Sequence, residues 1–159
     1  MDQIELRAFT APDADWVVDR HAALYAADEG YDTSFRDLVA EVVADFVRNH
    51  DAATEQGWIV ARGQTRLGSI FVVQDPAGPG IAKLRLVLLE PAARGTGLAQ
   101  RMLDTALNFA RAAGYGQLRL WNASTFVPEA VIPLGGATAH AMAASPDGFH
   151  VALGCEDAT

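Results

Sequence analysis

An apolar segment that runs into a glycine-containing turn and then into an amphipathic helix is the feature that most constrains the fold. Residues 86–89, LVLL, are apolar at every position, which is typical of a strand buried on both faces of a sheet. The turn EPAARGTG follows. The helical period of residues 98–113 predicts an inward face made of Leu98, Met102, Leu103, Ala106, Leu107 and Ala110. This succession predicts a central sheet covered by helices.

The preceding and following segments supply further elements. Residues 3–9 alternate between apolar and polar, as a strand does, and Thr10 or Asp13 is placed to cap a helix carrying Trp16, Val17, His21, Leu24 and Tyr25. Thr33 or Ser34 caps a second helix, whose inward face is expected to hold Phe35, Leu38, Val39, Val42, Val43, Phe46 and Val47. A hairpin over residues 58–75 and a strand over 117–121 complete the order β-α-α-β-β-β-α-β.

The signals weaken beyond Asn122. Residues 127–132, VPEAVI, are expected to form a short helix ended by Pro133, and GFHVAL, residues 148–153, a last strand. We expect one domain over residues 1–159, of the α/β (α+β) class, with 128–159 as its divergent part.

Charge and composition exclude several kinds of protein. The net charge of −8, from 20 acidic and 12 basic residues, disfavours nucleic acid as a partner and weakly favours a cationic substrate. The single cysteine, Cys155, excludes an internal disulfide and a cysteine-rich metal site, and we expect no metal. With no secretory signal and no apolar run of about 20 residues, we expect no membrane association and a cytoplasmic protein.

Three phosphate-binding motifs compete for the glycine turn. A P-loop needs a lysine beside the glycines, but the only lysine is Lys83. A dinucleotide-binding turn needs a third glycine, where this chain has Gln100, and an acidic residue that residues 105–128 do not contain. The pattern R/Q-x-x-G-x-G/A fits residues 94–99, RGTGLA. There the glycines allow close approach of a pyrophosphate, and the backbone amides of residues 95–100 lie at a helix N-terminus, which favours anions.

With its preceding strand, Pro91 and the helix behind it, this segment resembles the acetyl-CoA loop of the GNAT superfamily of N-acyltransferases. The resemblance covers about residues 2–127 and includes WIVAR, LGSIFVV, AKLRLVLLEPAARGTGLAQRMLDTALNFARAAGY and LRLW. These segments are similar to the acetyltransferase domain often fused to MarR-type regulators. The resemblance implies a GNAT-like mixed central sheet flanked by helices.

The resemblance also implies a site for acetyl-CoA as co-substrate. The central strand would separate from its neighbour, and the backbone of Val87, Leu88 and Leu89 would pair with the pantetheine arm. The backbone amides of the loop would hold the pyrophosphate, with the Arg94 side chain near them. These amides belong to Gly95, Thr96, Gly97, Leu98, Ala99 and Gln100.

The catalytic groups are less defined. Lys83 occupies the position at which some relatives carry a glutamate base. Glu29, beside Asp28 and Asp32 in the break between the first two helices, is the candidate base, with a solvated carboxylate as the alternative. Tyr25 and Trp121 are candidates to line the acceptor site, with core packing as the alternative. His21 is expected in the core, and Glu90 is either part of the site or a charge at a helix N-terminus.

The C-terminal part departs from the family pattern. Aligned without gaps, Pro133 stands where relatives place a tyrosine that protonates the departing thiolate, and Ala137-Thr138 replaces a Gly-Phe pair. One interpretation is an active enzyme that acetylates a primary amine, on a small molecule or a peptide. The alternative is a non-catalytic CoA-binding module or an interaction module, in which residues 128–159 contact a second copy in a homodimer.

Overall fold

The computed structural model describes residues 3–29, 33–75, 78, 80–93, 95, 97–121, 128–134, 139–144 and 151–155. Within these ranges, side chains are described for residues between 3 and 24 and between 36 and 119, and for Leu134. None of the described helices is long and apolar enough to cross a membrane.

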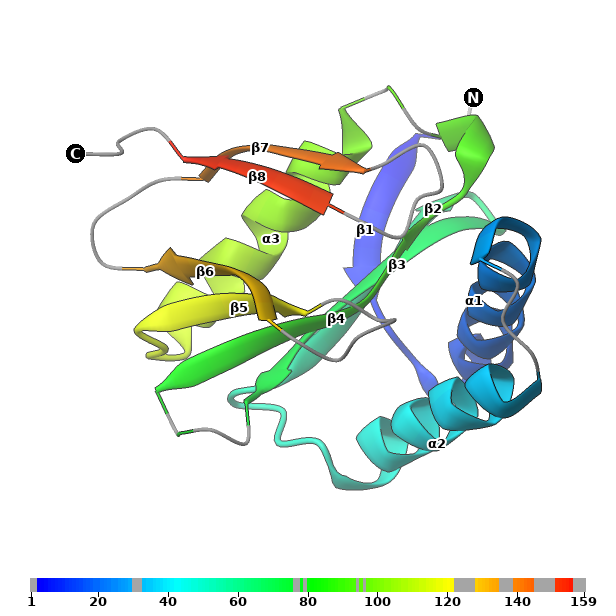
Figure 1. The fold of residues 1–159 in the computed structure, drawn as a ribbon, viewed down its shortest axis with the longest axis horizontal. Coiled ribbons are helices and arrows are strands. Elements are labelled where there is room, and N and C mark those ends of the chain that lie inside the picture. Colours follow the sequence, from blue (N-terminus) through cyan, green and yellow to red (C-terminus); the bar gives the residue numbers. More distant parts are fainter. Residues whose placement is uncertain are drawn as a thin grey trace.

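Six strands form one mixed sheet in which spatial order follows chain order (Figure 1). The strands are β1 (Ile4–Ala8), β2 (Gln56–Arg62), β3 (Thr65–Gln74), β4 (Ile81–Leu89), β5 (Gln117–Trp121) and β6 (Pro128–Pro133). Neighbouring strands are antiparallel except β4 and β5, which are parallel. A second sheet pairs β7 (Ala139–Ala144) with β8 (Val151–Cys155), and β7 lies against α3.

Three α-helices cover the two faces of the large sheet. The helices are α1 (Ala14–Glu29), α2 (Thr33–Asn49) and α3 (Leu98–Ala112), with short 3-10 turns η1 (Ala11–Asp13) and η2 (Pro91–Ala93). Figure 1 shows α3 on one side of the sheet and the pair α1 and α2 on the other. Because a parallel pair of strands needs a crossover connection, the chain passes from β4 to β5 through α3.

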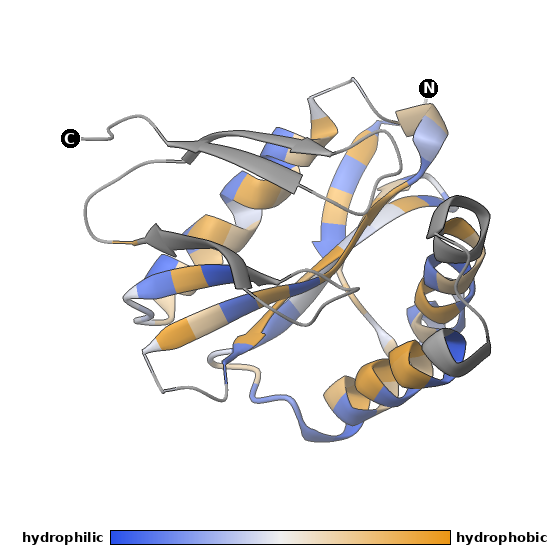
Figure 2. Ribbon diagram, in the orientation of Figure 1, coloured by the Kyte–Doolittle hydropathy of each residue, from blue (hydrophilic) through white to orange (hydrophobic). Residues whose placement is uncertain are grey.

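Each face of the sheet has its own core. The larger core joins α3 to residues such as Ile70, Leu84 and Leu118, whereas α1 and α2 pack through Val17 and Val43 on the other face. Figure 2 shows the corresponding bands of apolar residues along the helices. Because burial of apolar area is the main favourable term in folding, these two layers hold the helices on the sheet.

The expected element order from β1 to β5 is confirmed, and so is the inward face of α3. All six of its predicted core residues are buried, and the helix ends at Ala112, two residues before Gly114, which has a left-handed φ of 95°. The face of α2 is narrower than predicted. Its Leu38 and Val47 are 37% and 39% exposed, because the sheet meets only the stripe made by Val39, Val43 and Phe46.

The short helix expected over residues 127–132 is wrong. Residues Pro128–Pro133 form strand β6, antiparallel to β5, with Ile132 opposite Leu118 and Pro133 opposite Gln117. The β-branched Val131 and Ile132 suit a strand, and a proline is tolerated at the ends of an edge strand. The last expected strand is present as β8, displaced by a few residues toward the C-terminus.

A buried carboxylate fixes the start of α1. Asp13 is 1% exposed and accepts hydrogen bonds from Arg7 of β1, at 2.8 Å to each of its oxygens, and from Arg66 of β3, at 2.8 Å. Thr10 closes a capping box with the same carboxylate. The Arg7 guanidinium holds the pKa of Asp13 well below its usual range. This cluster ties the first helix to two strands and so sets the position of the α1–α2 layer.

Candidate functional site

Strand β4 extends beyond its pairing with β5. These strands pair over Ile81–Leu84 and Gln117–Leu120, β5 ends at Trp121, and β4 continues to Leu89. On this side, the segment Arg85–Leu89 has no paired strand among the described residues, and we call the unpaired edge beside β5 the fork. A fork of this kind leaves backbone edges available to a ligand that can pair with them as a strand would.

An irregularity in β4 lies at the opening of the fork. The register with β3 shifts by one residue between Ser69–Leu88 and Phe71–Arg85, which is a β-bulge. Leu86 adopts a left-handed φ of 54°, and the Ser69 hydroxyl donates a hydrogen bond of 2.7 Å to its carbonyl oxygen. A leucine in this conformation costs about 1–2 kcal/mol, so the surrounding structure holds β4 bent at this point.

Beyond the bulge, β4 and β3 approach each other closely. Leu88 is opposite Ser69, and Leu89 is opposite Gly68. A Cβ on Gly68 would lie 2.6 Å from the Leu88 carbonyl oxygen, so only glycine fits there. This contact secures one edge of Val87–Leu89 to β3 and leaves the other edge toward the fork.

The predicted glycine turn lies between β4 and α3. Gly95 and Gly97 have left-handed φ values of 77° and 82°, and Gly97 is the N-cap of α3. No heavy atom beyond the neighbouring residues lies within 4 Å of an added Cβ at either position, so the surface beside both glycines is open. Arg94 and Thr96, which the sequence also assigns to the site, lie outside the described residues.

The helix N-terminus is suited to an anion. The first turn of α3 contains no acidic residue, and the first backbone bond of the helix runs from the amide of Arg101 to the carbonyl of Gly97. The amides that precede it therefore point out of the helix end, where the dipole favours negative charge. Of the other predicted loop residues, Leu98 is buried by its side chain, and Ala99 and Gln100 are half-buried. The side-chain amide of Gln100 donates a hydrogen bond of 2.8 Å to Asp104, one turn further along the helix.

The candidate acceptor residues lie on two elements, and the pairing places one of them, Trp121, beside the fork. Tyr25 and Glu29 belong to the last two turns of α1, and Trp121 ends β5 one residue beyond the last pairing with β4. Their side chains are outside the described part of the structure, so their assigned roles stay predictions, as does the role of Asp28. Asp32 lies outside the described residues altogether.

Two other residues considered from the sequence have structural roles. Glu90 accepts two hydrogen bonds of 2.7 Å from Arg20, which fastens the end of β4 to α1. His21 is buried, and its Nδ1 donates to the Val17 carbonyl oxygen at 2.7 Å. Burial lowers the pKa of His21 to about 4, so the ring is neutral at pH 7. This agrees with the expected core position.

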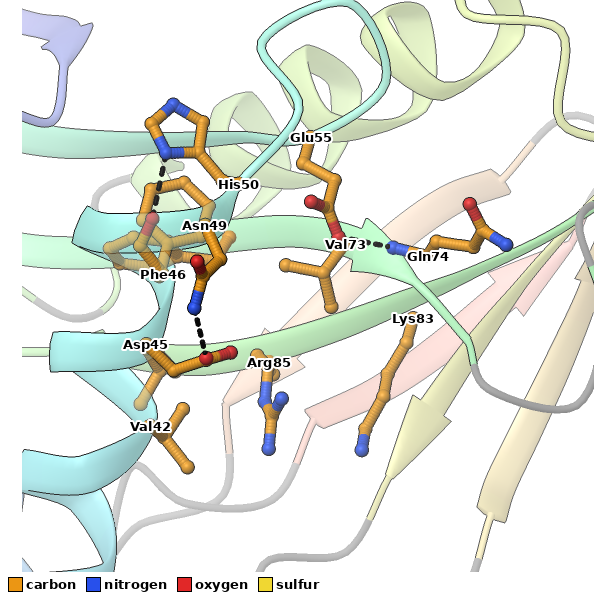
Figure 3. A pocket seen from close by; sticks show the side chains of 12 residues that line it. Val42, Asp45, Phe46, Asn49, His50, Glu55, Val73, Gln74, Lys83 and Arg85 are labelled. Atoms are coloured by element: carbon orange, nitrogen blue, oxygen red, sulfur yellow. Dashed lines mark hydrogen bonds between the residues drawn. The ribbon is translucent and has the colours of Figure 1, made fainter.

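A pocket that sequence reasoning missed lies between α2 and β4 (Figure 3). It has a volume of about 230 Å³, smaller than the 300–1,000 Å³ of sites for drug-sized ligands. Its apolar wall includes Phe46, Phe71 and Leu86, and its charged residues are Asp45, Glu55, Lys83 and Arg85. The sequence contains a signal for it: Lys83 and Arg85 are two cations at alternate positions of an otherwise apolar strand, and alternate residues share one face.

The two cations on β4 are held in a partly enclosed site. Figure 3 shows both side chains leaving the strand in the same direction. Burial lowers the pKa of Arg85, and the carboxylates of Asp45 and Glu55 oppose that shift. Burial and the charge of Arg85 lower the pKa of Lys83, with Asp75 acting against them. Among the residues that the structure describes, no group of three or more His, Cys, Asp or Glu side chains forms a metal site.

Comparison with known proteins places these features in a family context. A family model described as Acetyltransferase (GNAT) family matches residues 15–129, which extend from α1 into β6. No curated protein matches the chain significantly.

Solved structures share the fold at low sequence identity. A structure described as a predicted acetyltransferase with acetyl-CoA, from Clostridium acetobutylicum, has a TM-score of 0.62 at 17% identity, covering 78% of this chain and 84% of that one. A GNAT family acetyltransferase from Brucella melitensis, in complex with acetyl-CoA, has a TM-score of 0.60 at 19% identity, covering 76% of each chain. An acetyltransferase of the GNAT family from Staphylococcus aureus has a TM-score of 0.60 at 10% identity, covering 75% and 72%.

Proposed function

The chain belongs to the GNAT family of acetyltransferases, and from this we propose that it transfers an acetyl group from acetyl-CoA to the nitrogen of an amine. The fork between β4 and β5, with a glycine turn and a helix N-terminus at its open end, is the observation that carries the proposal. The pantetheine arm of acetyl-CoA is an extended chain with amide groups, which suits the free strand edge. Its pyrophosphate is an anion, which suits the helix end.

In this proposal two segments divide the binding between them, the end of β4 and the loop before α3. The backbone of Val87, Leu88 and Leu89 pairs with the pantetheine arm along the edge that faces the fork. The amides from Gly95 to Gln100 hold the pyrophosphate, with Arg94 and Thr96 completing the loop. The bend at Leu86 and the fit of Gly68 against Leu88 keep that edge in place, so little ordering is needed on binding.

Acetyl-CoA supplies an activated acetyl group as a thioester. The neutral amine nitrogen forms a C–N bond to the acetyl carbon, the C–S bond breaks, and the thiolate leaves with the electron pair. The proton of the amine passes to a base, for which Glu29 at the end of α1 is our candidate. Pro133 cannot donate a proton to the thiolate, but a thiol with a pKa of about 8–9 is a tolerable leaving group without one.

Several finer expectations belong to the same proposal. The acceptor is a primary amine on a small molecule or a peptide, with Tyr25 and Trp121 lining its site. The similarity to the domains fused to MarR-type regulators, the cytoplasmic location and the homodimer are likewise predictions from the sequence. The alternative function, a CoA-binding module without turnover, is supported by the sequence: aligned without gaps, Pro133 stands where relatives are expected to place the acid tyrosine.

Thiol release tests the proposal. The protein is mixed with acetyl-CoA and a broad panel of primary amines, and free CoA is followed with a thiol reagent. We expect release above the hydrolysis background with at least one amine, because the fork places the thioester within reach of an acceptor on the α1–α2 face. No release with any amine, in a protein that still binds acetyl-CoA, would favour the binding module.

A further inference from the structure

We propose that the pocket between α2 and β4 binds a carboxylate of the acceptor, so that the acceptor is a small amine that also bears a carboxylate, an amino acid in chemical class. The inference rests on the proposed function and names the substrate class of the same site. Arg85 is its principal contact, in a pocket whose charged and apolar walls come from α2, β3, β4 and the segment before β2.

The hydrogen bonds of the charged pocket residues indicate which kind of ligand group the pocket suits. Asp45 accepts from Asn49 at 2.7 Å, and Glu55 accepts from the backbone amides of Asp51 and Gln74, at 2.9 and 3.0 Å. Arg85, by contrast, forms no hydrogen bond or ion pair with the rest of the described chain, although its guanidinium offers five donors in a planar fork. Donors that are unpaired within the described chain and grouped inside a pocket suit a carboxylate, which matches the planar guanidinium with two parallel bonds.

A third cation strengthens the field at this point. Arg119 of β5 is the register partner of Lys83, so the two side chains leave the sheet on the same face. The Arg119 Nε is buried and has no hydrogen-bond partner among the residues described. Lys83, Arg85 and Arg119 thus gather positive charge where β4 and β5 part. Asp45 and Glu55 in the pocket and Asp75 near Lys83 formally balance these three cations, which favours a singly charged carboxylate held by directed hydrogen bonds over a phosphate dianion.

The pocket also lies at the end of the fork that is remote from the glycine turn, where the thioester is expected. Arg85 is the first residue of the separated segment, and it precedes Leu89 by four residues, or about 13 Å along the strand. With the pyrophosphate at the glycine turn beyond Leu89, the pantetheine arm runs back along β4, and its thioester end approaches Arg85. The phosphates of CoA are therefore too distant to be the anion in this pocket, whereas an acceptor there has its amine close to the thioester.

Transfer to matched acceptors tests the inference. Leucine, methionine and phenylalanine are each compared with their primary amides, which keep the amine and lose the carboxylate charge. We expect kcat/KM to favour the acids, and Arg85→Gln to reduce that preference by about 10- to 100-fold, the effect of one charge-assisted bidentate contact. The intrinsic reactivity of each amine cancels when wild type and variant are compared. Arg48→Gln, an exposed arginine of α2 outside the pocket, is the matched control and should keep the wild-type preference.

A binding measurement separates failure of this inference from failure of the proposed function. Calorimetric titration with N-acetylleucine and N-acetylleucinamide needs no turnover. We expect tighter binding of the acid, with a loss of about 10- to 100-fold in Arg85→Gln and none in Arg48→Gln. Equal binding of acid and amide to the wild type overturns the inference, even if amines are acetylated. Arg85-dependent binding of the acid without any thiol release would uphold the pocket and contradict catalysis. If Arg85→Gln does not fold, the comparison of N-acetylleucine with N-acetylleucinamide on the wild type still tests the inference.

Discussion

His21 and Arg85 are both ionisable side chains enclosed beneath the helical layer, and their surroundings give them different roles. The Nδ1 of His21 donates to the Val17 carbonyl one turn back on α1, in a core of apolar side chains. Arg85 lies in a pocket with other charged groups and no acceptor for its donors among the described residues. The first arrangement stabilises a helix, whereas the second is suited to a ligand. Burial alone therefore does not distinguish a structural residue from a binding residue, whereas the acceptors that its N–H donors reach differ between these two residues.

The burial of His21 predicts a pH dependence of stability. Its pKa is lowered to about 4 in the folded protein, against 6.5 for a free histidine. In the window between these values the unfolded chain binds a proton that the folded chain does not. The contribution of the neutral His21 to the free energy of unfolding is thus complete above about pH 6.5 and is lost as the pH falls toward 4. We expect the wild type to lose about 2 kcal/mol relative to His21→Leu between pH 7.5 and pH 5.

Urea unfolding of both proteins across this range measures the difference directly. Subtracting the two curves removes the contribution of the carboxylates, which both proteins share. Parallel curves would mean that His21 is not buried in its neutral form.

At the scale of the elements, α3 shows what a local pattern can predict. Its six buried residues and its end just before Gly114 followed from the helical period and one glycine, because both depend only on residues close in the sequence. Strand β6 shows the opposite. This six-residue segment, which begins and ends with proline, takes its structure from pairing with β5, and no local signal in the sequence identifies that partner.

The two left-handed glycines at the ends of α3 provide a matched test of the anion site. Gly97→Glu places a negative charge at the N-terminus, where the pyrophosphate is proposed, whereas Gly114→Glu makes the same substitution at a similar φ at the C-terminal end. Acetyl-CoA at about 100 times its Kd should stabilise the wild type by about 2.7 kcal/mol, or roughly 5–10 °C in Tm. We expect this shift to vanish in Gly97→Glu and to persist in Gly114→Glu.

Each variant is compared with its own ligand-free Tm, so that backbone strain common to both substitutions does not affect the result. An undiminished shift in Gly97→Glu would place the pyrophosphate away from α3.

At the scale of the whole molecule, the net charge does not predict the charges at the site. The chain carries a net charge of −8, which weakly favours a cation at long range. The pocket brings Lys83 and Arg85 of β4 together with Asp45 and Glu55, so its lining is formally neutral, and a ligand there interacts mainly with these groups because more distant charges are screened beyond a Debye length of about 8–10 Å. The sequence predicted the fold class and the glycine turn. It could not predict the pocket, because Asp45, Glu55 and Arg85 meet only after α2 packs on the sheet.

The fork between β4 and β5 is the basis of the whole account, and a crystal structure of the protein with acetyl-CoA tests it most directly. The account predicts the pantetheine arm between the two strands, along Val87–Leu89, with the pyrophosphate within hydrogen-bonding distance of the amides from Gly95 to Gln100. Its acetyl carbon should lie toward Arg85. Acetyl-CoA bound elsewhere, with β4 and β5 closed together beyond Leu84, would contradict the account.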